Sequence, residues 1–180
     1  MALLRSAMLE GWKDYFLLVG SAAAALIGLL FVVVTLTAGR ELGTVERGQK
    51  LYMTPIVFSL AAIVLLSGIA MAPMPPALFA GASGLIGLIG AIAQCRIALG
   101  LRKVAPDHTT TFDVTWYGVV PAITYAAQLV AAGVQLARPC AWALAALSAI
   151  VMVELLIAIH NAWDLVTYLA PRTDKPNELR

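Results

Sequence analysis

Five long apolar runs, separated by short polar segments, dominate the pattern of this chain. Each run is continuous and does not alternate at every second position, which indicates helices and not strands. A helix needs about 20 apolar residues to cross the hydrocarbon core of a bilayer. The pattern therefore predicts an all-α, polytopic transmembrane five-helix bundle, with spans at 15–38, 55–72, 77–101, 116–137 and 141–168.

The lengths of the runs refine this prediction. The second run is the shortest, and we expect its helix to begin at Pro55, because proline is tolerated in the first turn of a helix. The third and fifth runs are long enough to tilt or to project beyond the bilayer. We expect one transmembrane domain over 15–170, an interfacial lead-in over 1–14 and a disordered polar tail over 171–180.

Composition agrees with a membrane protein. Hydrophobic residues make up 61% of the chain and charged residues 12%, which is about half the charge of a soluble domain. The net charge of +2 is too small to suggest a nucleic-acid partner, so the lipid bilayer is the expected partner. Cys95 and Cys140 differ in predicted depth by about 20 Å, beyond disulfide reach, and we expect two free thiols. No Cys or His spacing suggests a metal site, and we expect no metal or cofactor.

The loop at 102–115 carries acidic residues, a histidine and three threonines. Asp107, His108 and Asp113 together suggest an ion site as one interpretation. The favoured interpretation is that Thr111 and Asp113 cap the fourth span, since these residue types accept hydrogen bonds from the free N–H groups of a first turn.

Positive charge is distributed unequally between the two sides. Three Lys or Arg residues lie on the side of the N-terminus and nine on the side of the C-terminus. The positive-inside rule then places the N-terminus outside and the C-terminus in the cytoplasm. Aromatic residues fall at the expected boundaries: Trp12, Tyr15, Phe79 and Trp142 at the outer ends, and Tyr52, Trp116, Tyr117, Trp163 and Tyr168 at the inner ends.

Small residues recur along the first and third spans at helical spacing. Helices in lipid associate where small side chains let their backbones approach closely. Five short helices cannot use so many small faces internally, so we expect a homo-oligomer as well as packing within the subunit. The expected packing positions are Gly20, Ala24, Gly28, Gly81, Gly84, Gly87 and Gly90.

Polar side chains at membrane depth concentrate on the fifth span. Around its axis Glu154 and Asn161 lie about 20° apart, and Asp164 and His160 extend the polar face to about 120°. Trp163 points the opposite way, toward lipid. Such groups usually face the bundle interior or a water-filled cavity. The candidate polar cluster consists of Glu154, Gln128, His160, Asn161, Asp164, Arg96 and Gln94.

Depth along the helices suggests partners for these groups. Glu154 lies near the midplane, where a lone carboxyl is expected to be protonated unless it accepts hydrogen bonds or meets water. Gln128 is its best candidate partner. Nearer the cytoplasm, Arg96 is expected to pair with Asp164 or to snorkel to the headgroups. His160 and Asp164, four residues apart, can also bond to each other.

Three roles are open to this cluster. Its members can hold the helices together through hydrogen bonds, or line a solvated path for ions or protons. The third role, intramembrane catalysis, is disfavoured because no serine or cysteine nucleophile lies beside a histidine and no HExxH motif is present. We therefore predict that the protein is not an enzyme.

Three segments carry a resemblance: GWKDYF at 11–16, SAAAALIGLLFVVVTL at 21–36 and HNAWDLV at 160–166. Together they resemble a group of small, largely uncharacterised bacterial integral membrane proteins, some of which are labelled as modulators of the FtsH protease. The resemblance covers about a fifth of the chain. It implies a location in the bacterial inner membrane and no particular activity, and it assigns no role to Asp164.

These observations lead to two functional predictions. The first is a homo-oligomeric channel or pore-like protein, with a polar path lined by the fourth and fifth spans and completed by the oligomer. The alternative is a non-enzymatic accessory or regulatory subunit that binds another membrane protein through its small-residue faces. An odd number of spans disfavours a secondary transporter built from two inverted halves.

Overall fold

The structure, a computed structural model, describes residues 10–37, 45–73, 75–104 and 114–169. Within these residues it contains helices and no strand, which confirms the all-α class. Five helical segments are long and apolar enough to cross a membrane, as predicted. The elements are α2 (Lys13–Thr37), α3 (Val45–Met71), α4 (Pro76–Val104), η1 (Thr115–Val119), α6 (Val120–Ala137) and α7 (Ala141–Leu169).

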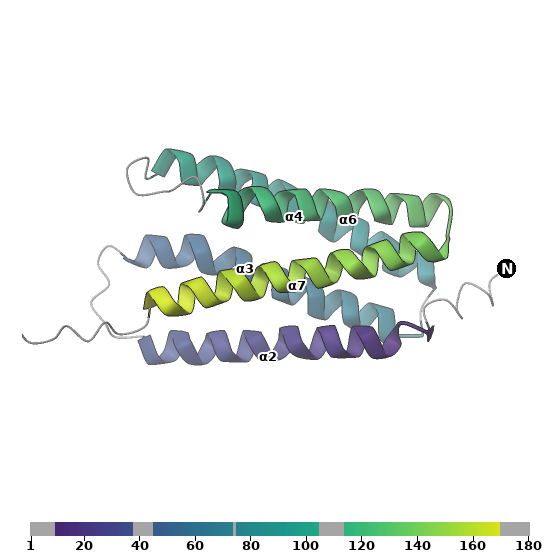
Figure 1. The fold of residues 1–180 in the computed structure, drawn as a ribbon, viewed down its shortest axis with the longest axis horizontal. Helices are drawn as coiled ribbons and strands as arrows, with labels where there is room; N and C mark the ends of the chain where they lie inside the picture. The colour runs from purple at the N-terminus through teal and green to yellow at the C-terminus, as the bar shows by residue number, and fades with distance from the viewer. Residues whose placement is uncertain (1–9, 38–44, 74, 105–113, 170–180) are drawn as a thin grey trace, which may run out of the picture.

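The helices run up and down in one elongated bundle (Figure 1). Successive long helices alternate in direction, so the start of α2 and the end of α7 lie at opposite ends of the bundle. Most of the predicted lead-in, the predicted tail, and the loop holding Thr111 and Asp113 lie outside the described residues. Which end faces the cytoplasm stays a prediction from the charge distribution.

That orientation is directly testable. We expect a reporter that fluoresces only in the cytoplasm to be active when fused after Arg180 and silent when fused before Met1. A reporter that works only outside the membrane should show the reverse. Activity of the cytoplasmic reporter at the N-terminus alone would invert the assignment.

The second span differs from the prediction at its start. Helix α3 begins at Val45, and Pro55 lies inside it instead of opening it. Its apolar, membrane-spanning part begins at Met53, close to the predicted position. Hydropathy therefore located the part of the helix that crosses lipid, and not the polar turns that extend it. The proline removes one backbone hydrogen bond, which membrane-spanning helices tolerate because neighbouring groups satisfy the freed backbone carbonyl.

The fourth span begins with a feature that the sequence analysis did not predict. Residues Thr115–Val119 form a π-helical turn, η1, which runs directly into α6. Gly118 in this turn lies against α4, where an added Cβ would come within 2.6 Å of the Ala98 Cβ. Single π-helical turns are rare in proteins overall, but a large share of those that occur are at functional sites.

Glycines bring α4 and α6 into close contact. Going along α4, Gly84, Gly87 and Gly90 lie beside Ala132, Leu129 and Tyr125 of the antiparallel α6. A Cβ at Gly87 would come within 2.8 Å of the Leu129 backbone nitrogen, so no larger residue fits there without a shift. These three glycines are packing positions, as predicted.

The other predicted packing positions divide into two kinds. Gly20 of α2 packs against Ser67 of α3, where a Cβ would lie 2.6 Å from the serine Cβ. Gly28 and Gly81 have no neighbour within 4 Å of an added Cβ, and Ala24 is exposed. The subunit therefore uses only part of its small-residue surface.

Helix α7 occupies the middle of the bundle, where it packs against α2, α3 and α6. At its two ends Trp142 and Trp163 are 86% and 68% exposed. They are separated by about 30 Å along the helix, which matches the thickness of a hydrocarbon core. Phe79 lies in the first turn of α4, at the predicted outer end, and is buried against Phe16, with ring centroids 5.2 Å apart.

Candidate functional site

Four helices bring polar and small residues together halfway along the bundle. The Tyr125 ring of α6 lies against Gly90 of α4, and its hydroxyl donates a hydrogen bond to the Ser59 hydroxyl of α3 at 2.9 Å. The buried Glu154 belongs to α7, which packs against both α3 and α6. Gln128 lies three residues after Tyr125 on the same buried face of α6. We call Ser59, Tyr125, Gln128 and Glu154 the midplane cluster.

Glu154 and Gln128 are buried inside one subunit. Their exposed fractions are 3% and 0%, so neither side chain faces lipid or an outer surface. Neither Glu154 oxygen, and neither polar atom of the Gln128 amide, has a hydrogen-bond partner among the described residues. The expected hydrogen bond between these two side chains is therefore not formed, although both are buried.

Positive charge is also missing around Glu154. The spans at 53–71, 115–137 and 141–167 contain no Lys or Arg, and Lys13 lies at the very start of the first span. Arg96 of α4 is exposed. A carboxylate buried without a cation or hydrogen-bond donors is strongly disfavoured, so the carboxyl must hold a proton or another cation.

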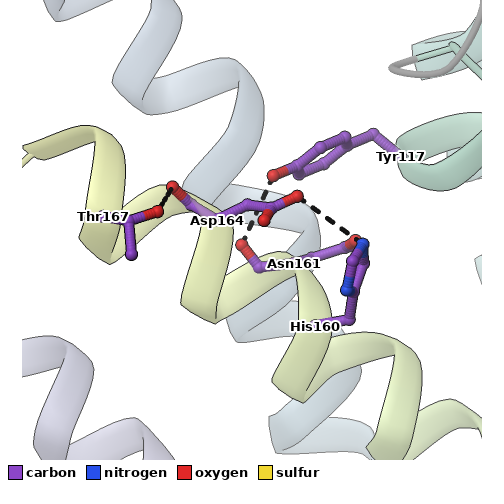
Figure 2. Close-up of polar contacts among 5 residues, drawn as sticks. All are labelled: Tyr117, His160, Asn161, Asp164 and Thr167. Carbon is purple, nitrogen blue, oxygen red and sulfur yellow. Dashed lines mark hydrogen bonds and ion pairs between the residues drawn. The ribbon is translucent and has the colours of Figure 1, made fainter.

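A second set of polar contacts lies toward the cytoplasmic end of α7, in the predicted orientation (Figure 2). His160 Nε2 lies 3.6 Å from Asp164 Oδ2, and both side chains are more than a third exposed. The Tyr117 hydroxyl of η1 donates to the Asn161 backbone carbonyl at 3.4 Å. The rings of Trp116 and His160 are 4.7 Å apart. We call Tyr117, His160, Asn161 and Asp164 the inner cluster.

The polar face predicted for the fifth span is confirmed. Glu154 and Asn161 are both buried, while His160 and Asp164 lie at the partly exposed edge of the same face. Trp163 is 68% exposed on the opposite side, as expected for a residue that faces lipid. The contact between His160 and Asp164 also matches the prediction.

The expected pair between Arg96 and Asp164 is wrong. Gln94 is 3% exposed and lies on the interior face of α4. Two residues further along, Arg96 points about 200° away from it and is exposed. Asp164 instead contacts His160. Snorkelling of Arg96 toward the headgroups is consistent with this outward position.

The register of the helices places Gln94 between the two clusters. Gly90 lies beside Tyr125, and Gln94 follows Gly90 by one turn on the same face of α4. Its Oε1 atom is buried and has no hydrogen-bond partner among the described residues. The same is true of Asn161 Oδ1, so unpaired amide oxygens continue from the midplane toward the inner cluster.

Sequence reasoning did not select Ser59, Tyr125 or the π-helical turn. Tyr125 lies in the middle of a span, far from the boundary where tyrosine normally lies, and only three residues from Gln128. That unusual depth was an available signal. Ser59 offered no such signal in the sequence. Serine in a membrane helix commonly donates a hydrogen bond to the backbone carbonyl four residues earlier, as the Ser59 hydroxyl does to the Pro55 carbonyl at 2.9 Å.

No group of three or more His, Cys, Asp or Glu side chains gathers as a metal site in the part of the chain that the structure describes. Cys95 and Cys140 are free thiols, as expected. Comparisons with models of protein families, with curated proteins and with solved structures found no match to this chain. The resemblance to small bacterial membrane proteins therefore stays a prediction from the three segments that carry it.

Proposed function

We propose that this integral membrane protein is a channel-like protein that passes protons along the interior of its helix bundle. The observation that carries the proposal is the Glu154 carboxyl, which is 3% exposed at the midplane and has no hydrogen-bond partner among the described residues. Ionisable groups at this depth commonly belong to ion or proton pathways. Glu154 is the central group that takes up and releases the proton.

A purely structural role explains the midplane cluster less well. Polar residues that hold membrane helices together do so through interhelical hydrogen bonds. Glu154 and Gln128 form no hydrogen bond within the described parts of the bundle, although both are buried. A buried polar group without a partner costs about 1–3 kcal/mol. Two such buried groups are expected where a proton transfer needs their free lone pairs.

Polar side chains follow the interior from one end of the bundle to the other. Gln135 accepts a hydrogen bond from the Cys140 backbone near the predicted outer end, and Gln128 lies two turns away on the same face of α6. Glu154 comes next. Gln94 and Asn161 then lead toward the inner cluster, whose partly exposed His160 and Asp164 meet the aqueous side.

The packing around this path favours protons over hydrated ions. The polar side chains along it, from Gln135 to Asn161, are between 0% and 6% exposed. A hydrated ion needs continuous free volume, whereas a proton moves by short transfers between side chains and waters. The path lies within one subunit, on the fourth and fifth spans with a contribution from α4.

Oligomerisation then has a role other than forming the path. Ala24, Gly28 and Gly81 remain without close neighbours inside the subunit. We propose that they pack between copies of the chain, giving a homo-oligomer in which each subunit has its own path. In keeping with the resemblance described above, we propose the bacterial plasma membrane as its location.

Reconstitution into liposomes tests the proposal. With a pH-sensitive dye inside the vesicles and a membrane potential set by a K⁺ gradient and an ionophore, the protein should accelerate proton entry well above the rate of empty vesicles. Equal rates in vesicles with and without the protein would overturn the proposed function.

A substitution in the inner cluster should reduce the proton flux only partly. His160→Ala removes one proton-accepting group at the partly exposed end of the path, where water can substitute for it. We expect the proton flux to fall by about two- to tenfold, well below the roughly 10²- to 10⁴-fold that a positioned general acid or base contributes in catalysis, because water can take over the transfer. A matched change, Trp163→Phe on the lipid-facing side of the same helix, should leave the flux unchanged.

The alternative, an accessory subunit that binds another membrane protein, is favoured by one observation. Only 22% of the apolar window of α2 is buried in the subunit, against 50% for α3 and for α7. Its open face carries exposed Leu17, Leu18 and Phe31 beside Ala24. This alternative predicts a stable hetero-complex after gentle extraction and no proton flux from the protein alone.

A further inference from the structure

We propose that the π-helical turn η1 is a gate at the inner end of the path, which opens when the turn changes from π-helical to α-helical form. The structure describes the closed form, in which η1 lies against α7 at Asn161, the buried polar residue next to His160. The inference rests on the proposed function, because the gate regulates the same path. The contact between η1 and α7 is nevertheless measurable without any flux.

Pro121 explains why a π-helical turn forms at this position. A proline ring inside a helix clashes with the carbonyl four residues earlier, and proline has no N–H to bond that carbonyl. Pro121 lies in the first turn of α6, directly after η1. The turn before it is widened, because the Val120 N–H bonds the Thr115 carbonyl, five residues earlier. The form of η1 therefore depends on a single residue.

Two aromatic side chains of η1 contact α7. The Tyr117 hydroxyl reaches across from η1 and donates to the Asn161 carbonyl at 3.4 Å (Figure 2). This distance is longer than the usual range of about 2.5–3.0 Å for an O–H···O bond, so the bond is weak. The Trp116 ring lies 4.7 Å from the His160 ring. These contacts hold η1 over the inner cluster and can be broken at low cost.

The buried apolar residues of η1 form a cluster separate from the main core of the bundle. Val114 and Tyr117 pack with Ile97 of α4, and with Trp116 and Val119. The main core lies among the long helices and includes none of these residues. A unit with few buried contacts opens at a lower free energy than the whole fold. The turn can therefore leave α7 while the rest of the bundle stays packed.

A change to α-helical form would turn the aromatic side chains away from α7. An α-helical turn closes its hydrogen bond over one residue fewer, so residues at the start of η1 would rotate by about 100° relative to α6. The Asn161 side chain is 6% exposed, and its Oδ1 atom has no hydrogen-bond partner among the described residues. Once uncovered, it would bind water and join the partly exposed His160 to the buried part of the path.

Thiol labelling at position 161 measures the opening directly. Asn161→Cys keeps the backbone carbonyl that accepts the Tyr117 hydrogen bond, and the native thiols Cys95 and Cys140 are replaced by alanine. The reagent is a charged, water-soluble maleimide added to the protein in liposomes. We expect slow labelling while η1 is closed, and faster labelling in every variant that opens it.

Tyr117→Phe and Gly118→Ala weaken the closed form in different ways. Tyr117→Phe keeps the ring and removes the donor, so labelling should accelerate about two- to tenfold, as for the loss of one hydrogen bond. Gly118→Ala places a methyl group 2.9 Å from the Ala98 Cα, a backbone atom that cannot rotate away. We expect a larger acceleration, about ten- to hundredfold, as for other overpacked positions. Gly133→Ala, where an added Cβ meets nothing within 4 Å, is the matched control.

Pro121→Ala tests the change of helical form itself. Alanine has no ring to clash and restores the N–H group, so an ordinary α-helical turn can form before it. We expect faster labelling at position 161 and a higher proton flux, although the contact residues Trp116 and Tyr117 are unchanged. Unaltered labelling in Pro121→Ala and in Gly118→Ala would overturn the gate.

A second thiol position distinguishes local opening from unfolding. Ser148 is 0% exposed and lies about 20 Å from Asn161 along α7. Ser148→Cys should stay unlabelled in the variants that accelerate labelling at position 161. Equal acceleration at both positions would show a general loosening of the bundle and contradict the proposal.

Failure of this inference and failure of the proposed function give different results. A protein that conducts protons, but whose labelling at position 161 is unaffected by the changes in η1, has a path without this gate. A protein whose labelling responds as expected, but which conducts no protons, has a movable turn over the inner cluster and no path.

Discussion

Replacing Glu154 with glutamine is expected to reduce proton flux to the level of protein-free liposomes. Glutamine has nearly the same size as glutamic acid, so the buried position keeps its volume and the bundle its packing. The amide cannot take up and release a proton at any accessible pH. Since the path has no second carboxyl within the buried part of the described bundle, no neighbouring group can replace it.

The same substitution can be followed by spectroscopy. If the carboxyl holds a proton, infrared difference spectra of the native protein should contain a protonated carboxylic acid band that disappears in Glu154→Gln. Glu10→Gln provides the matched control, because Glu10 is exposed and forms an ion pair with Lys13 at 2.7 Å outside the core. Undiminished flux in Glu154→Gln would show that protons take another route.

The second large effect concerns the contact between α4 and α6. Replacing Gly87 with alanine places a methyl group 2.8 Å from the Leu129 nitrogen and 2.9 Å from the Tyr125 carbonyl oxygen. These are backbone atoms, which cannot rotate away as a flexible side chain would. The two helices must separate, and we expect a loss of about 1–3 kcal/mol of stability, as for other overpacked positions. Thermal unfolding in detergent measures the change.

Gly133→Ala is the control for this prediction. Gly133 lies on α6, the other helix of this contact, but an added Cβ there would meet nothing within 4 Å. The substitution should leave the unfolding temperature unchanged or raise it slightly, because alanine favours the helix over glycine by up to about 1 kcal/mol. Equal destabilisation by the two substitutions would show that the effect comes from losing glycine and not from the helix contact.

The glycines and the polar site depend on each other. Gly90 allows α4 to approach so closely that the Tyr125 ring rests on its backbone, which directs the hydroxyl toward Ser59 across the bundle. A larger residue at position 90 would displace the ring and break this hydrogen bond. The packing of α4 on α6 therefore positions a residue of the midplane cluster.

The predictions from sequence succeeded where a property belongs to one helix. A periodicity of 100° per residue placed Glu154 and Asn161 on one face of α7 and Trp163 on the other, and their burial confirms this. The predicted partners were less successful. Arg96 and Asp164 do not pair, because the rotation of α4 that buries Gln94 turns Arg96 outward.

The sequence by itself therefore determined the membrane-embedded class, the number of spans and the polar face of the last helix, since each follows from hydropathy and helical geometry along a single segment. Only the tertiary structure decided that the Tyr125 hydroxyl reaches Ser59 across the bundle, and that Glu154 is buried without a hydrogen-bond partner among the described residues. These arrangements depend on the rotation and axial offset of the helices. In lipid, hydrophobic burial does not set these quantities, and close contact at small residues such as Gly87 and Gly90 does.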